Sequence, residues 1–150
     1  MDRLESAIAH ARRSTGTMAV MYLDIDDFKH INDNLDHDAG DTLLRISAAR
    51  MLAAVRQEDT VARMGGDEFV IVLWKLSQGE DVSSLAEKLM RAVSQSCSIQ
   101  GHSVKITVSI GIGIYPAHGE EAKMLIKNAD DALHEAKRAG KNCFRIAHCP

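Results

Sequence analysis

Residues 61–74 read VARMGGDEFVIVLW and place a pair of glycines between two short apolar runs. This arrangement predicts a β-hairpin whose turn lies at Gly65 and Gly66. The second run, residues 69–74, has the length and composition of a strand that is buried on both faces. Elsewhere helical and strand-like segments alternate along the chain, and this hairpin interrupts them. The hairpin therefore favours a mixed sheet over a purely parallel, doubly wound one.

Apolar patterns on both sides of the hairpin predict the other elements of the fold. Segments with apolar residues at helical spacing are residues 4–11, 44–55, 82–93 and 122–136. Runs typical of strands are residues 18–23, 104–114 and 143–147, and the second of these alternates with period two. Within that run, Gly111 and Gly113 predict a strand that another part of the backbone approaches closely. Gly140 predicts the end of the last helix.

The composition is that of one soluble domain. Of 150 residues, 45% are hydrophobic and 26% charged, which is enough to bury a core without disulfides or metal ions. The formal net charge of −3 does not provide the broad basic surface that duplex nucleic acid needs, so we expect no nucleic-acid partner. We find neither a secretion signal nor an apolar run near the roughly 20 residues that cross a bilayer. Cys97, Cys143 and Cys149 fit no metal or redox motif and are expected to be reduced thiols.

Two groups of acidic residues are the strongest candidates for chemistry. Asp24 directly ends an apolar run, where a carboxylate needs a partner, and Asp67 and Glu68 lie at the tip of the predicted hairpin. Carboxylates at the ends of adjacent strands can share a divalent cation. Mg²⁺ is usually held by one or two carboxylates, with phosphates and waters in the remaining positions. For Asp26 and Asp27, which follow closely, capping of the short helix after them is the favoured interpretation.

Basic and polar residues near these acids allow two interpretations each. Lys137 and Lys141 are four residues apart and can point the same way, toward phosphate oxygens. Lysines are also common at helix C-termini, and spacing alone favours that explanation. Asn32 and Asp41 flank a predicted turn at Gly40, and an amide with a carboxylate can read the edge of guanine. Both residue types are equally common at ordinary turns.

Residues 65–69, GGDEF, match the signature of the GGDEF domains, the diguanylate cyclases of bacterial signalling. Further segments that resemble this family, in the family's order, are residues 24–33, 37–41, 108–111, 128–133 and 140–142. The resemblance implies an α+β fold of the ferredoxin-like, nucleotidyl-cyclase type, with a central mixed, mainly antiparallel sheet flanked by helices. It also implies that residues 1–150 are one GGDEF domain, and we expect this domain to be a fragment of a larger multidomain signalling protein.

The resemblance implies a role for each candidate residue. The metal, Mg²⁺ or Mn²⁺, would be bound by Asp24, the carbonyl of Ile25 and Asp67. The catalytic residues would be Asp67, Glu68 and Lys29. The nucleotide-binding residues would be Phe28, Asn32, Asp41, Gly65, Gly66, Lys137 and Lys141, with Asn32 and Asp41 at guanine and the lysines at phosphates. Arg56 and Asp59 fit the family's RxxD product-inhibition motif, and the alternative for these two is an ordinary helix end with an ion pair.

The resemblance also implies an activity and partners. Two GTP molecules would be condensed into cyclic di-GMP and pyrophosphate by two domains facing each other across a two-fold axis. Cyclic di-GMP would be both product and inhibitor, and a sensor or a phosphodiesterase domain would be fused to this one. The expected location is the cytoplasm, although the parent protein could be anchored in a membrane. The alternative is a non-catalytic GGDEF module that binds GTP or cyclic di-GMP and regulates an attached domain such as a phosphodiesterase.

Several residues depart from the family's usual pattern. Asp36 stands where glycine is usual, His134 replaces a common tyrosine, and Lys141 replaces a common arginine. Lys141 keeps the positive charge but loses the two-pronged geometry of a guanidinium. None of these changes removes an expected metal ligand, but they keep the non-catalytic alternative open.

Overall fold

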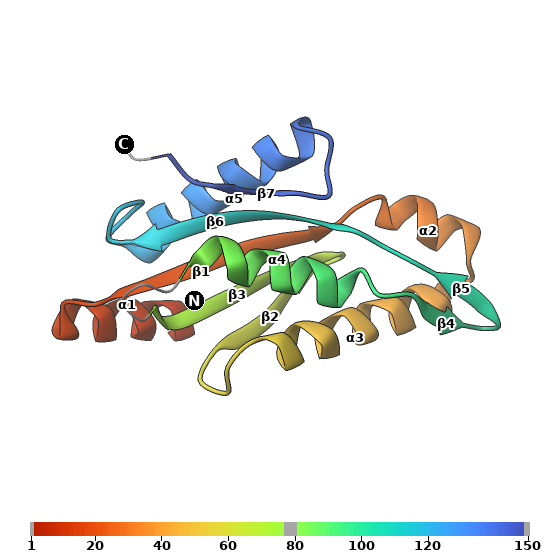
Figure 1. The fold of residues 1–150 in the computed structure, drawn as a ribbon, viewed down its shortest axis with the longest axis horizontal. Coiled ribbons are helices and arrows are strands. Elements are labelled where there is room, and N and C mark those ends of the chain that lie inside the picture. Colours follow the sequence, from red (N-terminus) through yellow and green to blue (C-terminus); the bar gives the residue numbers. More distant parts are fainter. Residues whose placement is uncertain (1, 77–80, 149–150) are drawn as a thin grey trace.

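A central sheet with helices on both faces forms the structure, a computed structural model that describes residues 2–76 and 81–148 (Figure 1). The helices are α1 (Asp2–Ser14), α2 (Phe28–Asn34), α3 (His37–Ala54), α4 (Val82–Val93) and α5 (Ala122–Arg138). The strands are β1 (Thr17–Ile25), β2 (Thr60–Gly65), β3 (Glu68–Leu76), β4 (Cys97–Ile99), β5 (His102–Val104), β6 (Val108–Tyr115) and β7 (Phe144–Ile146).

The main sheet is mixed and mainly antiparallel, as predicted. In the described part of the chain its strand order is β2-β3-β1-β6-β7, and only the β6–β7 pair is parallel. The connections β1-α3-β2 and β3-α4-β6 leave α3 and α4 on the same face, which is the ferredoxin-like arrangement. The apolar run of β1 is central because both of its edges are paired and both of its faces are covered.

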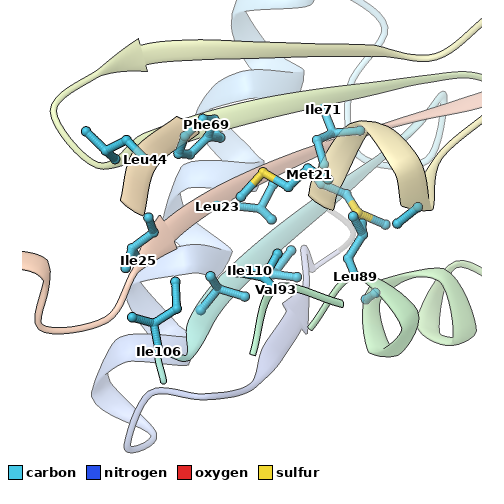
Figure 2. Close-up of a cluster of buried hydrophobic side chains, with 14 of the residues drawn as sticks. Met21, Leu23, Ile25, Leu44, Phe69, Ile71, Leu89, Val93, Ile106 and Ile110 are labelled. Atoms are coloured by element: carbon cyan, nitrogen blue, oxygen red, sulfur yellow. The ribbon is translucent and has the colours of Figure 1, made fainter. Parts of the chain in front are cut away.

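Each face of the sheet has its own hydrophobic core. Alternate residues of β1 point to opposite faces, so Met21 and Leu23 pack beneath α3 and α4 while Val20 packs toward α1 and α5. Figure 2 shows the first of these cores, where Phe69 and Ile71 of β3 join the β1 side chains. Burial of apolar side chains on both faces therefore stabilises the end of β1, and it holds the residues that follow this strand in place.

The β2–β3 hairpin lies where the glycine pair predicts it. Gly65 and Gly66 have φ angles of +146° and +53°, which residues with a side chain adopt only with strain. Residue Arg63 donates from Nε to the carbonyl of Gly66 at 2.9 Å and braces the turn. Because β3 pairs with both β2 and β1, the tip of this turn lies beside the end of β1 (Figure 1).

The close approach predicted at Gly111 is confirmed. A side chain at this position would collide with the backbone of α5 at Ala129 and Leu133. At Gly113 the corresponding nearest atom, the carbonyl oxygen of Leu125, would be 3.0 Å from an added Cβ. Glycine thus lets α5 lie directly on β6, and this contact carries the C-terminal end of α5 to the end of β1.

The prediction of one continuous strand over residues 104–114 is wrong. The strand β6 begins only at Val108, and residues 102–104 pair with β4 in a separate two-stranded hairpin. At the break, the carbonyl oxygen of Thr107 accepts a hydrogen bond from the Asp26 backbone N–H at 2.9 Å, which is a contact with a distant part of the sequence. The turn between β4 and β5, with Gln100 and Gly101 at positive φ, was not predicted.

The predicted turn at Gly40 is also wrong, because α3 begins earlier than its apolar pattern indicates. The side chain of Asp36 caps the helix by accepting from the N–H of Ala39 at 3.1 Å, so Gly40 and Asp41 lie inside α3. Asp36 also accepts from the Gln100 side-chain amide at 2.9 Å and so ties the β4–β5 hairpin to the start of α3. Both bonds give this departure from the family's usual glycine a structural role.

The remaining elements agree with the sequence patterns. α4 spans the predicted residues, and Gly140, at φ +115°, follows the end of α5. The last strand is shorter than predicted, at Phe144–Ile146. Cys97 and Cys143 are free thiols, and Cys149 lies outside the described residues. None of the described helices has the length and apolar character needed to cross a membrane.

Candidate active site

The end of β1 and the tip of the β2–β3 hairpin meet at one cavity of about 200 Å³. The Ile25 N–H donates to the carbonyl of Asp67 at 3.2 Å, and Asp24 is the cross-strand partner of Glu68. Residues that line the cavity are Asp24, Ile25, Asp26, Asp27, Phe28, Lys29, Asp67, Lys137 and Lys141. The structure thus brings together Asp24 and Asp67, which lie 43 positions apart in the sequence.

Asp24 is the most perturbed acid of this cavity. Only 8% of the residue is exposed, and burial raises the pKa of its carboxyl to about 6. This value also includes the effect of the Asp67 carboxylate, which raises the pKa, and that of the Lys137 ammonium, which pairs with Asp24 Oδ2 and lowers it. Two carboxylates held together at the edge of a core repel each other unless a cation lies between or beside them.

The donor set of this cavity fits a magnesium ion. Asp24 Oδ1 is buried and has no hydrogen-bond partner among the described residues. Asp67 and Ile25 line the same space, so residues that carry hard oxygen donors converge from two strand ends. Within residues 2–76 and 81–148 no cluster of three or more His, Cys, Asp or Glu side chains could hold a metal. A metal here would therefore need further oxygen ligands, such as those of a polyphosphate.

Lysines from three positions surround the acids. Lys137 comes from the last turn of α5, and Lys141 pairs with Asp27 at 2.7 Å from a backbone position with φ +66°. Lys29, on the first turn of α2, is exposed and lines the same cavity. The lysines lie close to the acids in this site. The general excess of lysine at helix C-termini therefore does not account for their placement.

Asp27 occupies the N-cap position of α2, but its side chain makes no capping hydrogen bond, so the expected side-chain cap is absent. Asp26 is buried and accepts from the hydroxyls of Thr107 and Ser109, both at 2.6 Å, and from the Asn142 N–H at 3.0 Å. Asp26 thereby joins the end of β1 to the start of β6 and to the loop that carries Lys141. Sequence reasoning missed this role because its partners lie more than 80 residues away, with separations of 81, 83 and 116.

Asn32 and Asp41 lie outside this cavity but close to each other. The Asn32 side chain lies over Gly40, where a Cβ would collide with its amide oxygen, and that oxygen has no hydrogen-bond partner among the described residues. Asp41 lines a second cavity of about 370 Å³ between α3 and the hairpin, together with Leu44 and Phe69. The edge of the Phe28 ring also lies near Gly40. The carboxylate of Asp41 beside the apolar wall of this cavity suits a planar base that carries donors, whereas Asn32 does not line the cavity.

Arg56 and Asp59 occupy the turn between α3 and β2. Asp59 is buried and accepts from the backbone N–H groups of Arg56 and Trp74 at 3.0 and 3.1 Å. The Arg56 guanidinium donates to the carbonyl of Lys75 at 3.2 Å and lies 3.9 Å from Glu58. A cavity of about 260 Å³ adjoins the pair, lined by Ala54, Val55, Arg56, Asp59, Leu73, Leu85, Lys88 and Leu89. The turn thus contains the ion pair of the ordinary interpretation and also a hollow beside the RxxD motif.

Glu68 has a partner that the sequence analysis did not anticipate. The Tyr22 hydroxyl donates to Glu68 Oε2 at 3.0 Å. Burial together with the Glu68 carboxylate raises the pKa of Tyr22 to about 12, so the phenol is a neutral donor at all physiological pH values. The only signal available in the sequence was the position of a tyrosine two residues before Asp24 in an otherwise aliphatic run.

A family model described as "Diguanylate cyclase, GGDEF domain" matches residues 1–143. The chain belongs to the GGDEF family. This membership covers both acidic groups, the hairpin and the lysines of α5. The ferredoxin-like core and the convergence of Asp24 with Asp67 are therefore features of a GGDEF domain.

Similar proteins place this GGDEF domain among bacterial signalling proteins. It is 46% identical over 145 residues to MucR of Pseudomonas aeruginosa, named a bifunctional diguanylate cyclase/cyclic di-GMP phosphodiesterase, covering 95% of this chain and 21% of MucR. It is 43% identical over 125 residues to NbdA of the same organism, named a cyclic di-GMP phosphodiesterase, covering 83% of this chain and 16% of NbdA. The chain therefore spans about a fifth or less of the length of these curated relatives.

The fold agrees with a solved structure of the family. The crystal structure of the GGDEF domain of TpbB, also called YfiN, from Pseudomonas aeruginosa superimposes with a TM-score of 0.94 at 36% identity. The match covers 99% of this chain and 93% of that one. The nucleotidyl-cyclase-like α+β architecture expected from the sequence is confirmed.

Proposed function

We propose that this GGDEF domain is a diguanylate cyclase domain that condenses two GTP molecules into cyclic di-GMP in the presence of Mg²⁺ or Mn²⁺. The observation that supports this most is the convergence of Asp24 and Asp67 on one cavity that lysines also line. A buried carboxylate oxygen without a partner among the described residues adds a ready metal ligand. The arrangement matches what phosphoryl transfer needs, namely positioning and charge neutralisation.

In the proposed mechanism, Asp24, the Ile25 carbonyl and Asp67 would hold the divalent ion together with the triphosphate of one GTP. A bound Mg²⁺ would polarise the α-phosphate and acidify the attacking hydroxyl. The 3′-hydroxyl oxygen of the other GTP forms a bond to the α-phosphorus, the bond to the β-phosphate oxygen breaks, and pyrophosphate leaves. Asp67 accepts the hydroxyl proton. Repeating this step with the roles of the two nucleotides exchanged closes the ring.

Lysines and the α2–α3 region complete the proposed nucleotide site. Lys29, Lys137 and Lys141 offset charge on the triphosphate and on the departing pyrophosphate. For Lys137 this requires leaving its pair with Asp24, which a second cation at that carboxylate would favour. Asn32 and Asp41 bind the guanine edge. Gly65 and Gly66 let the nucleotide lie close to the hairpin, because neither has a side chain.

A single domain holds one GTP in this arrangement, so the product requires two. Cyclic di-GMP is two-fold symmetric, and a pair of domains facing each other across a dyad matches that symmetry. We further propose that the domain belongs to a longer signalling protein whose other domains bring two copies together. The short share of MucR and NbdA that it covers supports this. We propose the cytoplasm, where GTP is available, as the location of the reaction.

Product inhibition is the proposed role of Arg56 and Asp59. The guanidinium would grip a guanine or phosphate of cyclic di-GMP, and the adjoining cavity of about 260 Å³ offers space next to it. Arg56→Ala should weaken inhibition of turnover by added product about tenfold. An inhibition curve identical to that of the original protein would remove this site from the proposal.

A non-catalytic regulatory module is the second candidate. The specific observation in its favour is the similarity to NbdA, whose name gives a phosphodiesterase activity and no cyclase. The intact acids at positions 24, 67 and 68 favour the first candidate. A module of this kind would bind GTP or cyclic di-GMP without consuming GTP.

Turnover of GTP by the longest natural protein that contains this domain, with Mg²⁺ present, tests the proposal. Asp67→Ala should reduce formation of cyclic di-GMP by at least about a thousandfold, because it removes both a ligand and the proton acceptor. Asp131→Ala, an exposed acid paired with Lys127 on α5, is the matched control and should be unaffected. Undiminished turnover in Asp67→Ala would end the proposal, and GTP binding without turnover in the original protein would favour the regulatory module.

A further inference from the structure

Tyr22 and Glu68 lie on the same face of adjacent strands. β1 pairs with β3 so that Asp24 is opposite Glu68 and Tyr22 is opposite Val70. Residues two apart on a strand share a face, so Tyr22 is the diagonal neighbour of Glu68 and lies directly behind Asp24. Its hydroxyl spans this diagonal and donates to Glu68 Oε2 at 3.0 Å.

The phenol ring of Tyr22 is held by the fold on the side away from the cavity. Its partner on β6 is Gly111, the glycine over which the backbone of α5 packs. The ring also packs against the core cluster beneath α1 and α5, which includes Val20, Val70 and Ala129. A tyrosine side chain has only two main torsions, so a packed ring presents its hydroxyl at a nearly fixed point.

Glu68 lacks comparable support from its own position. It is the first residue of β3, immediately after the turn, and it is only half-buried. Its backbone neighbours on that side, Gly66 and Asp67, form the tip of the β2–β3 turn. A glutamate has three torsions and loses up to about 2 kcal/mol of side-chain entropy when it is fixed. The hydrogen bond from Tyr22 supplies that restraint before any ligand arrives.

We propose that Tyr22 is a positioning residue whose hydroxyl fixes the Glu68 carboxylate beside Asp24, so that the site presents a preoriented negative charge to the divalent ion. This inference rests on the proposed function, since it assigns Glu68 a part in the metal site. The side-chain contact of Tyr22 with the site is its hydrogen bond to Glu68 Oε2. It acts only through Glu68, as the partners behind metal ligands generally do.

Binding of Mn²⁺ in the presence of a non-hydrolysable GTP analogue tests this without requiring turnover. Free Mn²⁺ is measured by electron paramagnetic resonance for the original protein and for Tyr22→Phe, Glu68→Ala and the double variant. The chain has two tyrosines, and Tyr115→Phe on β6 is the matched control, because it removes a buried hydroxyl far along the strand from the site. Tyr22→Met is added because it changes the packing as well as removing the hydroxyl, and melting temperatures verify that each variant is folded.

The expected result is that Tyr22→Phe and Tyr22→Met each weaken Mn²⁺ binding by about tenfold, while Tyr115→Phe stays within about twofold. In the Glu68→Ala background, adding Tyr22→Phe should change nothing further, since the group it positions is gone. The inference is overturned if Tyr22→Phe behaves like Tyr115→Phe, if only Tyr22→Met loses affinity, or if the effect of Tyr22→Phe persists without Glu68.

Turnover of GTP measured in parallel separates this inference from the proposed function. If the original protein makes no cyclic di-GMP, the cyclase proposal fails while the Mn²⁺ data still decide the role of Tyr22. If it does turn over GTP, then at saturating Mg²⁺ Tyr22→Phe should lower kcat by about tenfold and leave KM for GTP within about twofold, because guanine and phosphate contacts are untouched. A raised KM with unchanged kcat would contradict a role through Glu68.

Discussion

Lys137 of α5 pairs with Asp24 at the end of β1, although 113 residues separate them in the sequence. The contact exists because Gly111 lets α5 lie on β6, which in turn pairs with β1. Two layers of the fold, the central sheet and α5, therefore meet at one carboxylate. The charge that the site needs for a divalent ion is present in the folded domain before the ion binds, and it carries a cost in stability.

That cost predicts that Asp24→Asn stabilises the metal-free domain at neutral pH. The pKa of Asp24 is raised from 3.8 to about 6, mainly by burial, so its favourable contribution is complete below 3.8 and is lost as the pH rises through 6. At pH 7.5 the asparagine should raise the free energy of unfolding by about 1–3 kcal/mol. Urea denaturation measures this, and the difference should shrink toward zero near pH 4. Equal or lower stability of the variant at pH 7.5 would show that the carboxylate is not strained.

Asp26→Ala is expected to destabilise the domain by about 2–4 kcal/mol. The change leaves the hydroxyls of Thr107 and Ser109 and the N–H of Asn142 without their shared acceptor. Asp33→Ala, which removes an exposed acid on α2, is the control and should cost less than about 0.5 kcal/mol. Chemical denaturation compares the two, and similar losses would mean that the buried network around Asp26 contributes little.

The glycines of β6 should differ in their tolerance of a methyl group. Gly111→Ala should destabilise by more than about 3 kcal/mol, because the added carbon meets the backbone of Ala129 and Leu133, which cannot move without separating α5 from the sheet. Gly113→Ala should cost less, since its nearest backbone atom lies at 3.0 Å. Melting temperatures of the two variants give the order, and the reverse order would contradict the close packing of α5.

His118 predicts a pH dependence of stability of the opposite sign to that of Asp24. Its Nδ1 accepts the N–H of Ile114 at 2.9 Å, and burial, with a smaller effect of His148, lowers its pKa below 6.5. The unfolded chain binds the proton more readily, so stability is complete above pH 6.5 and falls as the pH drops below it. His118→Asn keeps an acceptor without titrating. The melting temperature of this variant should fall less than that of the original protein between pH 7.5 and 5.5. An equal fall in both proteins would exclude this role of His118.

Features set by local pattern could be predicted from the sequence. The hairpin at Gly65 and Gly66 and the stop at Gly140 follow from backbone conformations that favour glycine, which the sequence states directly. The position of Asp24 at the end of an apolar run indicated a site because a carboxylate there needs a partner. These features depend on residues within a few positions of each other.

Features set by distant contacts could not be predicted. The alternating pattern of residues 104–114 is equally compatible with one strand or two, and at the break Thr107 contacts Asp26, a residue from a distant part of the sequence. Likewise, the start of α3 depends on Asp36, which precedes the apolar stripe and is also held by Gln100 from another hairpin. The partners of Glu68 and Asp26 lie across strands, where sequence spacing carries no information.

The most direct test of the site is the position of one metal ion. Crystals grown with Mn²⁺ and a non-hydrolysable GTP analogue would locate the ion by its anomalous scattering. We expect a single strong peak within about 2.0–2.4 Å of carboxylate oxygens of both Asp24 and Asp67, with triphosphate oxygens completing its shell. Bound nucleotide with no peak between these two side chains, or with the metal held by other residues, would contradict the shared site.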